Sequence, residues 1–186
     1  MRRMLDLTYA AALVASATAL VAIAVLVFVQ IAGRILDRAL LAMGQDVLGL
    51  QVPSLAEIGG FLFVAATFLA LPATLRSAGH VRVTILAKTL PDTLARGLTV
   101  IVLAAALALA GFAVWHSGLQ MADSWAFNSV SFGMVRIPLW LPQGAMTLGL
   151  VIFALAIADE LVTALSGGTP GFVAAEASRS IDDGGH

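Results

Sequence analysis

The chain has 186 residues, of which 60% are hydrophobic and only 11% charged, and its formal net charge is −1. A soluble domain usually carries about 25% charged residues, so this chain cannot cover itself with polar surface in water, and we expect an integral membrane protein. It has no basic run to attract nucleic acid. It also has no cysteine, which excludes disulfides and cysteine-ligated metal or iron–sulfur sites.

The first apolar run covers about residues 7–33 and follows Met1-Arg2-Arg3. It is much longer than the roughly 7–15 apolar residues of a signal peptide, so we expect a retained transmembrane helix. At 1.5 Å per residue the helix would be about 40 Å long, beyond the roughly 30 Å hydrocarbon core, and it should therefore tilt. Residues 34–53 mix apolar and charged side chains. For them we predict an interfacial or membrane-adjacent helix that ends near Gly44.

The second span is expected over residues 54–75. Ser54 and Glu57 stand three residues apart ahead of the apolar run, a capping-box pattern that satisfies free backbone N–H groups at a helix start. Capping is the simplest role for Glu57, and the positive end of the helix dipole also favours it. The alternative is that Glu57 contacts a partner subunit through a carboxylate at the membrane edge.

A polar segment follows, and it contains His80 and Arg82. Apolar residues alternate over residues 80–85, which would suit a strand, but an isolated strand at a membrane leaves backbone groups unpaired at high cost. The apolar spacing from Val83 to Leu90 fits an amphipathic helix lying in the interface, and we predict that arm helix. His80 and Arg82 either bind anionic lipid headgroups or make a fixed contact within a bundle or complex.

The third and fourth spans are expected over residues 94–115 and 139–165. Ala104, Ala108 and Gly111 give the third span a small face for close helix packing. Residues 116–136 form a connecting loop with aromatic rings suited to the headgroup level, and Trp140 is a similar aromatic at the start of the fourth span.

Near the end of the fourth span, Asp159 and Glu160 are expected at a solvated helix end. The small, polar residues 166–186 are expected to form a flexible tail.

The positions of lysine and arginine orient the spans. With the N-terminus inside, the cytoplasmic side holds Arg2, Arg3, Arg76, Arg82, Lys88, Arg96 and Arg179, and the outer side holds Arg34, Arg38 and Arg136. This excess agrees with the positive-inside rule. We therefore predict an all-α membrane protein with one four-span domain over residues 1–165, both termini cytoplasmic, and a flexible cytoplasmic tail over residues 166–186.

No arrangement of residues in the sequence points to an enzyme or a cofactor. Neither a glycine-rich phosphate loop nor a Ser/His/Asp or paired-carboxylate arrangement is present, and a haem anchor would need paired histidines within the spans. The alternative function is a stand-alone four-span exporter acting as a homodimer. Such an exporter needs a carboxylate deep inside a span, and the sole candidate, Glu57, stands at a helix start.

Three motifs resemble the DctQ-like family, the small membrane subunit of TRAP (tripartite ATP-independent periplasmic) transporters. They are Glu57 opening the second span, Gly79-His80-Val81-Arg82-Val83 followed by Leu90-Pro91, and Ile137-Pro138-Leu139-Trp140-Leu141-Pro142-Gln143-Gly144 opening the fourth. The resemblance covers about residues 5–165 in order and spacing. In two respects the sequence departs from the family: Ser54-Leu55-Ala56 replaces an aromatic residue usual before the Glu, and the link from Arg34 to Glu57 is longer.

The resemblance implies a three-part secondary transporter in the cell inner membrane. A periplasmic binding protein would deliver an organic acid to a large multi-span permease subunit, which carries the substrate and sodium sites and moves like an elevator. The small subunit would be non-catalytic and would scaffold the large one, in contact with membrane lipids. The residues expected to support its fold and subunit contact, without binding substrate, are Glu57, Gly79, His80, Arg82, Pro91, Trp140 and Pro142.

Overall fold

The computed structural model describes residues 2–77, 91–168 and 170–173. Within them lie four long helices: α1 (Arg2–Ala42), α2 (Leu55–Arg76), α4 (Asp92–Ala126) and α5 (Trp140–Leu165). Each is long and apolar enough to cross a membrane. The described residues contain no β-strand beyond a single isolated bridge, so the predicted all-α four-span architecture is confirmed. The predicted arm helix after the second span falls on residues 78–90, outside the described residues.

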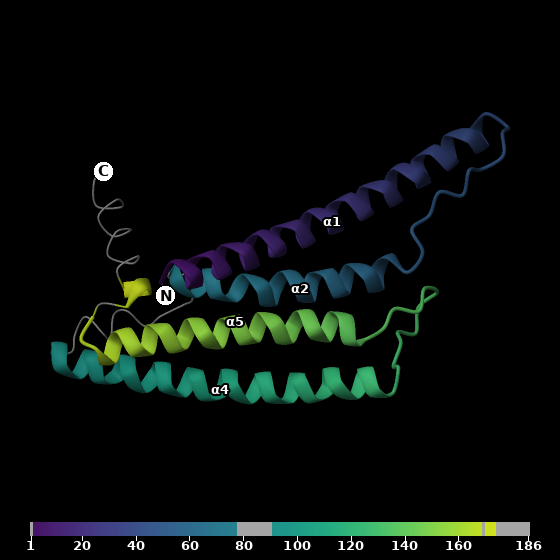
Figure 1. Cartoon of the computed structure of the whole chain (residues 1–186). Helices are drawn as coiled ribbons and strands as arrows, with labels where there is room; N and C mark the ends of the chain where they lie inside the picture. Colours follow the sequence, from purple (N-terminus) through teal and green to yellow (C-terminus); the bar gives the residue numbers. More distant parts are fainter. Residues whose placement is uncertain (1, 78–90, 169, 174–186) are drawn as a thin grey trace, which may run out of the picture.

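The helices lie side by side in the order α1, α2, α5, α4 (Figure 1). Segments 43–54 and 127–139 connect α1 to α2 and α4 to α5 at one end of the bundle, here called the loop end. The starts of α1 and α4 and the ends of α2 and α5 lie at the opposite end, here called the terminus end (Figure 1). The two central helices, α2 and α5, therefore run in the same direction.

Two helices are longer than the sequence analysis predicted. α1 continues without interruption to Ala42, so the separate membrane-adjacent helix expected after residue 33 is wrong, although the predicted end near Gly44 is right. Gly44 has a positive φ of 71°, which glycine adopts without steric cost. α4 likewise continues to Ala126, which makes residues 116–126 helical and shortens the predicted loop. The boundaries of α2 and α5 agree with prediction to within one residue.

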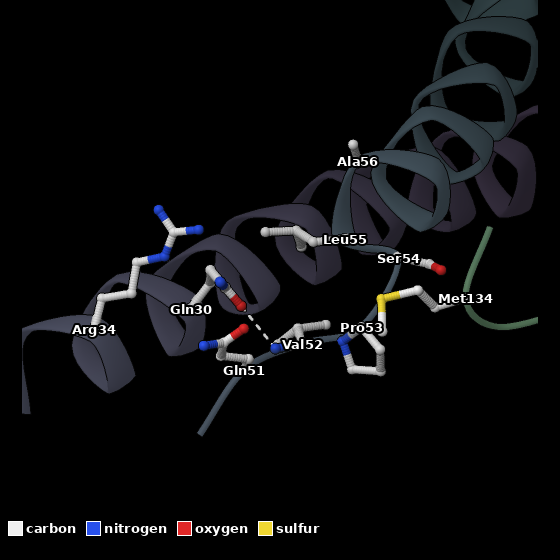
Figure 2. Close-up of a pocket in the computed structure, with 9 residues that line it drawn as sticks. All are labelled: Gln30, Arg34, Gln51, Val52, Pro53, Ser54, Leu55, Ala56 and Met134. Carbon is white, nitrogen blue, oxygen red and sulfur yellow. Dashed lines mark hydrogen bonds between the residues drawn. The ribbon is translucent and has the colours of Figure 1, made fainter. Parts of the chain in front are cut away.

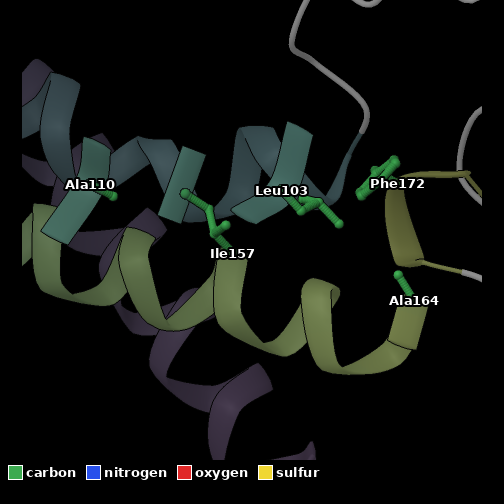
Figure 3. Packing of buried hydrophobic residues seen from close by; sticks show 5 residues of the cluster. All are labelled: Leu103, Ala110, Ile157, Ala164 and Phe172. Carbon is green, nitrogen blue, oxygen red and sulfur yellow. The ribbon is translucent and has the colours of Figure 1, made fainter. Parts of the chain in front are cut away.

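The helices pack through small and aliphatic side chains. A close backbone approach lies at Gly149 of α5, where an added Cβ atom would lie 2.6 Å from the backbone carbon of Phe68 in α2. In the α1–α2 contact, the buried Ser16 hydroxyl donates a 2.7 Å hydrogen bond to the carbonyl oxygen of Ala66. The largest buried cluster joins α4, α5 and the segment after α5, and consists of Leu103, Ala110, Ile157, Ala164 and Phe172 (Figure 3).

The segment after α5 folds back onto the bundle. Phe172 is only 4% exposed, and the backbone N–H of Gly171 donates a 2.6 Å hydrogen bond to Oε2 of Glu160. Residues 170–173 thus differ from the flexible tail expected over residues 166–186. Glu160 is 3% exposed, so the expectation that it stands at a solvated helix end is wrong, because this returning segment covers it.

Candidate functional site

The candidate residues lie at both ends of the bundle. Glu57, Trp140 and Pro142 lie at the loop end, where α2 and α5 begin, whereas Pro91 precedes α4 at the terminus end. Gly79, His80 and Arg82 lie outside the described residues. The structure therefore brings two of the three family motifs to the same end of the bundle.

The start of α2 is not a capping box. Ser54 adopts a left-handed backbone conformation with φ 54°, and its side chain makes no hydrogen bond to the first turn of the helix. Its hydroxyl instead accepts a 3.0 Å hydrogen bond from the backbone N–H of Val135 in the loop between α4 and α5. Ser54 thus joins the two connections at the loop end, and the predicted capping role is wrong.

Glu57 lies in the first turn of α2 and is covered by the same loop. A Cβ atom added to Gly133 would lie 1.9 Å from Glu57 Oε2, so the loop passes closely over the carboxylate and a larger residue there would displace the Glu57 side chain. That oxygen is buried and has no hydrogen-bond partner among the described residues. The positive end of the α2 dipole favours a negative charge at this position. Glu57 Oε2 nevertheless accepts no hydrogen bond from a backbone N–H group of the helix start.

The loop over Glu57 is a short hairpin-like turn. The N–H of Ser131 donates to the carbonyl of Ile137, and the N–H of Leu139 donates to the carbonyl of Ser129, both at 2.9 Å. The Ser131 hydroxyl also accepts a 3.1 Å hydrogen bond from the N–H of Ile137. These bonds hold the loop in one shape and leave the apolar side chain of Phe132 fully exposed at its tip.

The start of α5 is fixed against the end of α4. The rings of Trp125 and Trp140 meet edge to face with centroids 4.8 Å apart, a favourable geometry for aromatic pairs. Pro142 lies in the first turn of α5, where the missing N–H of proline breaks no helical hydrogen bond. Trp140 is partly buried at this helix start, which fits the interfacial aromatic that the sequence predicts.

The long link between α1 and α2 is bonded to α1. Asp37 Oδ1 accepts hydrogen bonds from the N–H groups of Leu48 and Gly49 at 3.0 and 3.2 Å. Gln30 Oε1 accepts one from the N–H of Val52 at 2.6 Å (Figure 2). Residues 48–52 of this link therefore run back along the last turns of α1.

Charged residues tie the helices together at the terminus end. Arg76 at the end of α2 forms an ion pair with Asp6 of α1, and its guanidinium lies 5.1 Å from the ring centroid of the buried Tyr9. Sequence reasoning missed Asp6 and Tyr9. The available signal was that α1 begins and α2 ends at the same membrane face, which brings opposite charges together.

At the same end, Arg96 of α4 donates a 3.1 Å hydrogen bond to the carbonyl of Gly167, just after α5. Pro91 immediately precedes α4, and its carbonyl accepts the first helical hydrogen bond, from the N–H of Ala95 at 3.0 Å. Pro91 thus sets the start of the third span.

The described residues contain no group of three or more His, Cys, Asp or Glu side chains that could hold a metal ion. What the loop end offers instead is a fixed loop, a covered carboxylate and exposed apolar tips, which are features of a contact surface.

Comparison with known proteins identifies the family. Residues 23–167 match the family model described as tripartite ATP-independent periplasmic transporters, DctQ component. A search of curated proteins found no match. The matched region runs from the middle of α1 to the turn after α5, so it contains both connections at the loop end and most of the chain. The chain therefore belongs to the DctQ component family of tripartite ATP-independent periplasmic transporters.

Proposed function

We propose that the chain is the non-catalytic small permease subunit of a sodium-driven, binding-protein-dependent transporter for organic acids. In this proposal it packs against a large elevator-type subunit and scaffolds it. The family match carries the proposal: it makes the chain a small permease subunit of a TRAP transporter in the inner membrane, working with the larger subunits. The sodium gradient, the organic acid and the scaffolding role are the proposed additions.

The form of the spans supports a scaffolding role. Substrate sites of secondary transporters are typically built from helices that break near the middle of the membrane, whereas α1, α2, α4 and α5 are each continuous. The outer helices also expose many large apolar side chains, which need lipid or a partner to cover them. Such surfaces suit a subunit that enlarges a complex.

In the proposed orientation both termini are cytoplasmic and the loop end faces the periplasm, which follows from the placement of lysine and arginine. Glu57, Trp140 and Pro142 then shape the periplasmic face that meets the larger subunit or the binding protein. Pro91, with Gly79, His80 and Arg82, belongs to the cytoplasmic side, where the two cations contact lipid headgroups or the large subunit.

Co-purification and transport would test the proposal. The tagged chain, co-expressed with a large permease subunit encoded beside it, should retain that subunit in mild detergent. Uptake of an organic acid into proteoliposomes should require both subunits, the binding protein and a sodium gradient. The chain alone should show no organic-acid binding in calorimetry, and micromolar binding would contradict the proposed division of labour.

The exporter alternative is disfavoured by the family match and by the position of Glu57. A proton-coupled exporter needs a carboxylate deep in a span, but Glu57 lies in the first turn of α2 under the α4–α5 loop. A drug-resistance assay separates the two functions, because only the exporter predicts that Glu57→Gln abolishes resistance conferred by the chain.

A further inference from the structure

A pocket of about 630 Å³ opens at the loop end between α1, the link and the start of α2 (Figure 2). Gln30 and Arg34 of α1 line it, and Gln51 of the link lies beside Gln30. The rest of the wall is mainly apolar and includes Val52, Pro53, Leu55, Ala56 and Met134. The pocket thus combines one cation and two amides with an apolar lining.

Arg34 supplies the only charge among the residues that line the pocket. Within the described part of the chain it has no carboxylate partner, since the ion pair found there joins Arg76 to Asp6. The nearby carboxylate of Asp37 already accepts two backbone N–H groups of the link. A guanidinium in this situation suits a phosphate group, which can accept two of its N–H bonds at once.

The pocket also lies at the height of a lipid headgroup. Arg34 is the first charged residue after the long apolar run of α1, so it marks the boundary between hydrocarbon and water. Below it, α1 exposes large apolar side chains such as Phe28 and Ile31. A ligand with an anionic head and an apolar tail would match both surfaces at once.

We propose that this pocket binds the headgroup of an anionic phospholipid, with Arg34 holding the phosphate. No carboxylate lines the pocket, so nothing there pairs with the ammonium of a zwitterionic headgroup. The Gln51 amide can donate to or accept from hydroxyl groups of the headgroup. A net negative lipid such as phosphatidylglycerol is therefore preferred over phosphatidylcholine.

The test uses the full chain in neutral detergent, titrated with dioctanoyl phosphatidylglycerol or dioctanoyl phosphatidylcholine and read by native mass spectrometry. The wild type should bind phosphatidylglycerol more tightly than phosphatidylcholine. Arg34→Gln should weaken phosphatidylglycerol binding about tenfold, the size expected for losing a hydrogen bond to a charged group. Arg38→Gln is the matched control, because Arg38 lies one turn further along α1 and does not line the pocket.

A second variant tests the pocket independently of charge. Ala56→Phe should block the site while leaving Arg34 in place, and circular dichroism should show unchanged helicity in every variant. Equal losses from Arg34→Gln and Arg38→Gln would overturn the proposal in favour of a diffuse charge effect. Displacement of the lipid by equimolar inorganic phosphate would also overturn it, because the site would then be one for soluble anions. Neither result depends on transport, so a failure of the lipid proposal can be distinguished from a failure of the proposed transporter function.

Discussion

The close contact between α2 and α5 predicts a specific cost for one methyl group. In Gly149→Ala the new Cβ atom would lie 2.6 Å from the carbonyl carbon and 2.7 Å from the carbonyl oxygen of Phe68. Both obstructing atoms belong to the backbone, so no side-chain rotation can relieve the clash. The two central helices of the bundle must therefore move apart.

The loss of stability in Gly149→Ala can be estimated by comparison with a helical glycine that has free space around it. Overpacking a tight interface typically costs about 1–3 kcal/mol, and a backbone obstacle places this variant at the upper end. Replacing glycine by alanine within a helix also stabilises the helix by about 1 kcal/mol. Gly111→Ala in α4 has the same stabilisation but no clash, because its Cβ would meet nothing within 4 Å. The free energy of unfolding should therefore differ between the two variants by about 2–3 kcal/mol.

The assay is reversible unfolding in mixed micelles at increasing fractions of dodecyl sulfate, followed by circular dichroism. Gly144→Ala provides an intermediate case on α5 itself, because its Cβ would meet only the flexible sulfur of Met121 at 3.3 Å. The expected order of stability is Gly111→Ala, then Gly144→Ala, then Gly149→Ala. If Gly149→Ala proved as stable as Gly111→Ala, the tight α2–α5 contact would be wrong.

Three further changes test other contacts. Ser16→Ala removes the hydrogen bond between α1 and α2 and should cost about 0.6 kcal/mol of unfolding free energy, the average for such bonds in membranes. Gly133→Ala should destabilise the chain only mildly, because the Glu57 side chain that its Cβ would meet can move aside. Glu57→Ala should relieve that loss, so a double-mutant cycle should give a coupling near the lower end of about 0.5–3 kcal/mol, and strict additivity would contradict the contact. Phe172→Ala should weaken the packing of residues 170–173 against the bundle by about 3 kcal/mol, so that proteinase K cleaves there roughly a hundredfold faster. The control Leu165→Ala, at an exposed position, should leave the cleavage rate unchanged.

The sequence predicted helix boundaries well where a chain-breaking residue marks them. Pro53 precedes α2, Pro138 precedes α5, and Gly167 follows it, so both central helices were located to within one residue. The predicted end of α1 was too early because hydropathy falls at Arg34, whereas arginine is a good helix former. α1 therefore passes through Arg34 and Arg38 and ends only at Ala42, two residues before Gly44. The predicted end of α4 was too early because the apolar run stops at the polar residues His116-Ser117-Gly118.

The contacts at the helix ends could not be predicted from local patterns. Ser54 and Glu57 have the spacing of a capping box, but the hydroxyl of Ser54 bonds to Val135, which is 81 residues away in the sequence. Glu160 was expected in solvent because nothing in its neighbourhood indicates that residues 170–173 return to cover it. In both cases a distant segment decides how a polar side chain is satisfied, and a single sequence does not reveal such pairings.

The distribution of unsatisfied polar atoms supports the loop end as a contact surface. Three buried side-chain atoms of the described residues have no hydrogen-bond partner, and two of them, Glu57 Oε2 and Gln143 Oε1, belong to the first turns of α2 and α5. The third is the hydroxyl of Tyr9 at the terminus end. Leaving such a group unpaired costs about 1–3 kcal/mol, so a partner or water that donates to both oxygens gains that energy on binding. Because Glu57 Oε2 is buried beneath the loop at Gly133, a donor from the larger subunit would reach it only if that loop shifted.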